Sequence, residues 1–191
     1  MATKTTKDRL LDEAELLCQT RGFNAFSFKA LAEALEIKTA SVHYHFPTKA
    51  DLGLALVQRY RERFESQVAR VSSGRSSRDR IASYVDIFAR LARSHRLCLC
   101  GSLAGDFATL SDEVQGEVRD YFAASEAWLE GVLEAGRTAG EVSFQGEARA
   151  TSRVLIGMLE GTMLSARASG SPNRLRDTKR WILDFLAVPT P

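Results

Sequence analysis

Hydrophobic residues recur at helical spacing along most of the chain. Near the N-terminus, Leu10, Leu11, Ala14, Leu17 and Cys18 fall on one face of a helix. Further along, a longer stripe contains Val57, Tyr60, Phe64, Val68 and Val71. No run of alternating β-branched residues suggests a strand, and the stretches between glycines and prolines are rich in good helix formers. The pattern predicts an all-α protein.

Breakers and capping residues divide this pattern into nine helices. We expect them at about 6–20, 28–35 and 40–46, in a long segment beginning after Thr48, and at 77–95, 100–108, 112–138, 146–168 and 173–187. Ser27, Thr39 and Thr48 are expected to be N-caps, and so is Ser171, which precedes Pro172. Three helices form a small N-terminal head, and six form a larger body.

Composition and charge narrow the class of protein without naming a function. The chain of 191 residues is 45% hydrophobic and 26% charged, and its net charge is only +2. This is typical of a folded globular protein, so any case for nucleic-acid binding must come from local pattern. No apolar stretch of membrane-spanning length and no secretory signal is found, and we expect a cytoplasmic protein. Three cysteines do not make a disulfide framework.

The segment 27–52 carries the clearest functional pattern. Two helices separated by a tight turn, the second short and stopped by Pro47, make a helix-turn-helix. The free face of the second helix contains small or hydrogen-bonding residues: Thr39, Ala40, Ser41, His43 and Tyr44. Positions 37 to 50 contain no acidic residue, but they contain two lysines, Lys38 and Lys49. Such a face suits base edges and phosphates, although two packed helices in any all-α protein remain an alternative.

The same stretch closely resembles the signature of the TetR family of bacterial transcriptional regulators. The resemblance rests on RGF at the first helix end, on LAEALEI, and on KTASVHYHFPTKADL, whose Tyr44-to-Leu52 ending is especially specific. It implies a nine-helix, two-domain fold, with a DNA-binding head at 1–50 and a ligand-binding and dimerisation body at 51–191. It also implies a repressor that a small-molecule effector releases from its operator.

Site residues follow from this resemblance position by position. Ala40, Ser41, His43 and Tyr44 would face DNA in the major groove, and Lys49 would hold a phosphate. The full set expected to contact double-stranded DNA is Ser27, Lys29, Lys38, Thr39, Ala40, Ser41, His43, Tyr44, Thr48 and Lys49. We expect no cofactor and no metal.

The body is expected to supply a homodimer interface and an effector pocket. The eighth helix carries Gly157 and Gly161 on a face small enough for close helix contact, and the ninth carries Trp181 and Phe185. By resemblance, these two helices pair with those of a second subunit. Candidate pocket residues, which core packing would explain equally well, are Phe88, Leu91, His95, Phe107, Tyr121, Phe122, Trp128, Met158 and Met163.

Two other functions remain as alternatives, and a third is not expected. Cys98 and Cys100 lie in a segment, CLCGSLAGDFATL, that resembles a TetR subgroup with cysteine-based sensing of oxidants or electrophiles. A dimeric helical adaptor without DNA binding would have the same body. An enzyme is not expected, because the sequence lacks the common catalytic and nucleotide-binding motifs.

Overall fold

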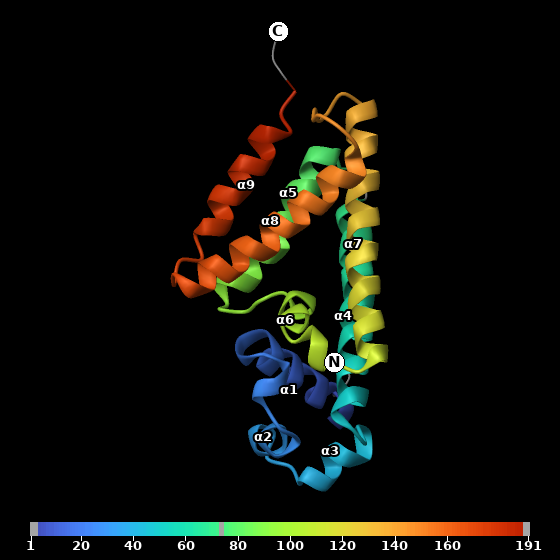
Figure 1. Cartoon of the computed structure of the whole chain (residues 1–191), viewed down its shortest axis with the longest axis vertical. Coiled ribbons are helices and arrows are strands. Elements are labelled where there is room, and N and C mark those ends of the chain that lie inside the picture. Colours follow the sequence, from blue (N-terminus) through green and yellow to red (C-terminus); the bar gives the residue numbers. More distant parts are fainter. Residues whose placement is uncertain (1–3, 73–74, 189–191) are drawn as a thin grey trace. The chain divides into compact units, whose positions relative to one another are not determined.

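The computed structural model describes residues 4–72 and 75–188, except for the side chains of 71 and 72. Within these residues it contains nine α-helices, two short 3₁₀ helices and no strand, which confirms the all-α prediction (Figure 1). The α-helices are α1 (Thr6–Arg21), α2 (Phe28–Ala34), α3 (Thr39–His45), α4 (Lys49–Ser72), α5 (Ser77–Arg93), α6 (Leu99–Gly105), α7 (Asp112–Thr138), α8 (Ala148–Ala168) and α9 (Arg174–Phe185). The 3₁₀ helices are η1 (Phe23–Ala25) and η2 (Phe107–Thr109).

The chain divides into two compact units that do not follow the sequence order. The first comprises Met1–Glu62 and Leu99–Tyr121, and the second comprises Arg63–Cys98 and Phe122–Pro191. The first unit therefore contains the helix-turn-helix together with α6, η2 and the first part of α7. No helix among the described residues is both long and apolar enough to cross a membrane.

The apolar stripes lie where the periodicity predicts them. All five stripe residues of α1 are buried, and in α4 Val57, Phe64 and Val68 are buried while Tyr60 is partly exposed. The side chain of Val71 lies outside the described part of the chain. Complete burial of a Leu or Phe side chain contributes roughly 1.5–3 kcal/mol, so these stripes hold each helix against its unit.

Two of the predicted N-caps are confirmed. The Ser27 hydroxyl accepts a hydrogen bond from the Ala30 N–H at 3.2 Å and caps α2. Thr48 and Asp51 form a capping box at the start of α4: the Thr48 hydroxyl accepts from the Asp51 N–H, and Asp51 Oδ2 accepts from the Thr48 N–H.

Two other capping predictions are wrong. Lys38 is the N-cap of α3 and makes no side-chain capping bond there, so Thr39 is the first residue inside the helix. Helix α9 begins three residues after Ser171, at Arg174, because Pro172 and Asn173 form a turn instead of the first helical positions. Side-chain capping potential alone therefore did not locate these two helix starts.

Four helices end in the same hydrogen-bonded turn. After α2, the Ile37 N–H donates to the Ala32 carbonyl at 3.0 Å and the Glu36 N–H donates to the Glu33 carbonyl at 3.2 Å. Helices α5, α7 and α8 end in the same way, with the left-handed position occupied by His95, Gly140 and Gly170. At Glu36 the φ angle is 55°, a conformation that costs an L-residue with a side chain about 1–2 kcal/mol.

Replacing Glu36 with glycine is therefore expected to stabilise the head. Glycine relieves the left-handed strain but loses more backbone entropy on folding, so the expected net gain is roughly 0.5–1 kcal/mol in the free energy of unfolding. Urea unfolding followed by circular dichroism measures it. Glu33→Gly, the same exchange inside α2, is the matched control and is expected to destabilise by about 1 kcal/mol. A lower unfolding midpoint for both variants would contradict the role assigned to Glu36.

Candidate functional site

The helix-turn-helix holds α3 by a small apolar core and leaves its outer face free. Leu31, Val42 and Phe46 are buried between α1, α2 and α3. On the opposite side, Tyr44 is 83% exposed, and Ala40 and His43 are also exposed. Thr39 and Ser41 are partly exposed. The structure thus brings the side chains predicted to contact bases onto one accessible helix.

The aromatic residues of α3 have defined surroundings. The His43 ring packs edge-on against Phe28, with centroids 5.0 Å apart, and its Nδ1 lies 3.3 Å from the Pro47 carbonyl oxygen. The Tyr44 ring packs edge-on against the His45 ring, with centroids 5.1 Å apart. His43 is therefore oriented by the head, whereas Tyr44 projects outward.

The predicted phosphate-contacting residues border the same face. Ser27, Lys29, Lys38 and Thr48 are all exposed, at the start of α2 and on either side of α3. Lys49 differs from them, because its ammonium donates to the Phe26 carbonyl at 2.6 Å and lies over the rings of Phe23 and Phe26. Burial lowers the pKa of Lys49 from its ordinary value. Its primary contacts in this structure are inside the head.

A second set of polar contacts joins α1 and η1 to α6 and to the segment that follows α6, within the first unit. Asp106 Oδ2 accepts a hydrogen bond from the Phe23 N–H at 3.0 Å, and Ser102 donates to the Cys18 carbonyl at 2.9 Å. The Asn24 side-chain amide donates to the Thr109 hydroxyl at 2.8 Å. These contacts span more than 80 residues of sequence, since Phe23 and Asp106 are 83 positions apart. Sequence reasoning did not find them.

The three cysteines are all buried, and none of them forms a disulfide. Burial raises the pKa of Cys18 to about 12, so this thiol stays protonated at neutral pH. Cys98 and Cys100 are 1% and 0% exposed. Within the described residues, no group of three or more His, Cys, Asp or Glu side chains could hold a metal ion.

The candidate pocket residues are divided between the two units. Phe107 and Tyr121 belong to the first, where Arg119 lies over the Phe107 ring and Tyr60 contacts Tyr121. The second unit contains Phe88, Leu91, His95, Phe122, Trp128, Met158 and Met163. Neither unit therefore contains all of the residues that were predicted to line one pocket.

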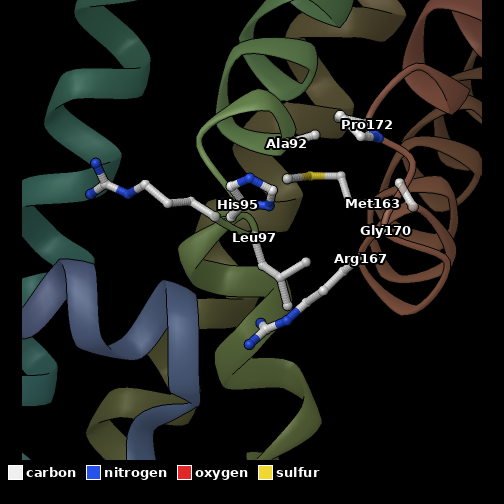
Figure 2. A pocket seen from close by; sticks show the side chains of 9 residues that line it. Ala92, His95, Leu97, Met163, Arg167, Gly170 and Pro172 are labelled. Atoms are coloured by element: carbon white, nitrogen blue, oxygen red, sulfur yellow. The ribbon is translucent and has the colours of Figure 1, made fainter.

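One small cavity in the second unit uses part of the predicted set. His95 lines it from the turn after α5, Met163 from α8, and Pro172 from the turn before α9 (Figure 2). Its volume is about 40 Å³. Drug-sized ligands occupy roughly 300–1,000 Å³, so this cavity is too small for such an effector.

Comparison with known proteins agrees with this architecture. Residues 10–56 match the model of bacterial regulatory proteins of the tetR family, and residues 77–182 match the tetracyclin repressor-like C-terminal domain. The chain therefore belongs to the TetR family, and it is a DNA-binding transcriptional regulator, not an enzyme.

Individual relatives extend over nearly the whole chain. The HTH-type transcriptional repressor NemR of Escherichia coli K12 is 26% identical over 189 residues, which cover 96% of this chain and 95% of NemR. A TetR-family regulator from Agrobacterium tumefaciens is 31% identical, with a TM-score of 0.91, over 95% of this chain and 97% of that one. A TetR regulator from Legionella pneumophila is 32% identical, with a TM-score of 0.87, over 98% and 100%.

Proposed function

We propose that this protein is a dimeric repressor whose α3 face reads an operator and whose affinity for DNA falls when an effector binds the second unit. The observation that carries the DNA-reading role is the exposure of Tyr44, Ala40 and His43 on one short helix in a segment free of acidic residues. NemR, a relative that represses transcription, supports repression as the effect of DNA binding on transcription. We expect the protein to act in the cytoplasm, where the operator lies.

The division of labour on this surface follows from side-chain chemistry. Ala40, Ser41, His43 and Tyr44 are assigned to base edges, since α3 is the helix available to the major groove. Ser27, Lys29, Lys38, Thr39 and Thr48 are assigned to phosphates. Lys49 is also assigned to a phosphate, which requires its ammonium to exchange the Phe26 carbonyl for a phosphate oxygen.

The experiment is fluorescence anisotropy of the protein with the DNA upstream of its own gene, and with an unrelated duplex, at two salt concentrations. We expect tight binding to the upstream DNA that weakens as salt rises, because phosphate contacts release counterions. Tyr44→Ala is expected to weaken it by roughly tenfold or more, since one base contact contributes about 1–3 kcal/mol. Tyr44→Phe removes the hydroxyl and keeps the ring, so it distinguishes the contribution of the hydroxyl to DNA binding from that of the ring.

Equal, weak binding of the wild type to both duplexes would favour the adaptor alternative, once an operator had also been sought by selection from random DNA. Unchanged specific binding by Tyr44→Ala would instead remove α3 from the proposed contact surface while leaving the regulator itself in place.

The second unit presents the surface that we assign to the homodimer. Large apolar side chains are exposed on α8 and α9, which lie side by side (Figure 1): Val154, Leu164, Trp181 and Phe185 are 62%, 56%, 50% and 45% exposed. The rings of Trp181 and Phe185 are stacked, with centroids 5.1 Å apart. Large exposed apolar side chains on two neighbouring helices are typical of an interaction site, and the pairing of α8 and α9 with a second copy would cover them.

Signal transfer to DNA is assigned to α6. Because Asp106 and Ser102 bind the backbone of η1 and α1, a displacement of α6 would move the head with it. A coupling of about 1–3 kcal/mol would change operator affinity 5- to 150-fold. The thiol-sensor alternative, acting through Cys98 or Cys100, has less support, since both thiols are buried and reactive cysteines need access.

A further inference from the structure

The second unit contains buried polar atoms that its own fold does not satisfy. Tyr84 on α5, Ser125 on α7 and Glu160 on α8 each have a buried oxygen without a hydrogen-bond partner: the Tyr84 hydroxyl, the Ser125 hydroxyl and Glu160 Oε1. Tyr84 is 2% exposed and Ser125 is 0% exposed. A buried polar group without a hydrogen-bond partner costs free energy, so each of these oxygens requires an explanation.

These three oxygens belong to one cluster. Ser125 lies beside the Tyr84 phenol without reaching hydrogen-bond geometry, and Glu160 is close enough to act electrostatically on it. The Cys98 thiol lies close enough to the Glu160 carboxyl to lower its pKa. Glu160 as a residue is only partly buried, although its Oε1 is buried.

Aromatic rings surround the same point. The centroid of the Tyr84 ring lies 5.2 Å from those of Phe88 and Trp128 and 6.2 Å from that of Phe64. Ring faces attract cations, and their edges and faces bind apolar groups. The cluster therefore combines an acidic group and two hydroxyl oxygens with an aromatic wall.

We propose that this cluster, formed by Tyr84, Ser125 and Glu160, binds the effector and that the effector is a small primary amine in its ammonium form. A primary ammonium has three N–H donors and no acceptor, which matches the three unpartnered oxygens. Its organic substituent would lie against Phe88 and Trp128. The inference rests on the proposed function, since it names the class of molecule to which the repressor responds.

Other occupants fit less well. An anion would place a second negative charge beside the Glu160 carboxylate, and a neutral alcohol has a single donor for three acceptors. Burial raises the pKa of Glu160 to about 7, against the effect of the Cys98 thiol, which lowers it. The carboxyl group is thus short of the positive partner that would favour its charged form.

The test uses the full-length protein and isothermal titration calorimetry with benzylamine, and with benzyl alcohol and benzoate as probes of the same size. Benzylamine is expected to bind at least roughly tenfold more tightly than benzyl alcohol or benzoate. Neither of these two probes carries an ammonium group, so neither can form the ion pair with Glu160 in this partly buried site. Glu160→Gln is expected to remove that preference. Glu130→Gln on α7 is the matched control and is expected to retain it.

Tyr84→Phe supplies a second variant, which keeps the ring and removes one of the three oxygens, with an expected several-fold loss. Benzylamine should also release operator DNA from the wild type but not from Glu160→Gln. Equal affinity for the three probes, no binding of benzylamine, or full binding by Glu160→Gln would overturn the inference. Operator binding in the absence of any probe is measured separately, so its failure would overturn the proposed function and leave the calorimetry interpretable.

Discussion

Gly161→Glu is expected to convert the protein from a dimer into a monomer and to weaken operator binding by roughly 10²- to 10⁴-fold. The large loss follows because two linked heads bind two half-sites with a high effective concentration, which a single head lacks. Gly161 and Gly157 lie on α8, and a Cβ atom at either position would meet nothing within 4 Å in its own subunit. The substitution therefore causes no clash within the isolated subunit.

The control for this prediction lies on a neighbouring helix. Gly131 on α7 is also exposed, and a Cβ atom there has nothing within 4 Å. Gly131→Glu adds the same charge and removes the same helix glycine, which is worth about 1 kcal/mol of helix stability in both variants. Sedimentation equilibrium and anisotropy would be measured for both proteins. A dimeric Gly161→Glu variant with wild-type affinity would rule out this face of α8 as the interface.

Arg59→Ala is expected to destabilise the first unit by about 3 kcal/mol, the lower end of the usual cost of removing one member of a buried ion pair, because the Arg59 and Asp12 side chains are 19% and 38% exposed. The Arg59 guanidinium binds Asp12 at 2.9 Å and Glu15 at 3.2 Å, and the Glu15 side chain is only 8% exposed. These bonds hold α4 against α1. Loss of Arg59 would leave the Glu15 carboxylate without this partner in a region poor in water.

Urea unfolding measures the effect, with Arg70→Ala as a control on the exposed end of α4, where a change within about 0.5 kcal/mol is expected. The double variant Arg59→Met, Glu15→Leu is expected to recover most of the stability, because both charges leave the interior together. A loss below about 1 kcal/mol for Arg59→Ala would show that the pair is solvated, contrary to its small exposed area.

Local signals predicted the helices well, since periodicity and capping act over a few residues. The segment 112–138 was predicted with the bounds that α7 has, and Ser27 and Thr48 cap the helices that they precede. The helix-turn-helix was equally predictable from the sequence, because its turn, its end at Pro47 and its resemblance to the family lie within about 30 consecutive residues. Thr39 failed as a cap because capping preference is a weak constraint beside tertiary packing.

Groups distant in sequence were not predictable in this way. The Asp106 bond to Phe23 depends on how α6 packs against α1, which no local pattern encodes. The cluster around Tyr84 was not predicted, because it combines hydroxyl and carboxyl oxygens, whereas aromatic residues and methionines make up most of the expected pocket lining. A signal was present: Glu160 follows the buried Ile156 by four positions and precedes the buried Met163 by three, so an acidic residue interrupts the apolar stripe of α8.

The bonds from Asp106 and Ser102 to the head also limit how this regulator can be recombined with others. A hybrid that exchanged residues 1–50 alone would replace Phe23, Asn24 and Cys18 while keeping Asp106, Thr109 and Ser102, and it would join surfaces that had never been matched. A transplantable operator-reading module must instead carry residues 99–121 along with 1–62. For protein engineers, the exchangeable part of this chain is discontinuous, and a hybrid needs three crossovers, after residues 62, 98 and 121.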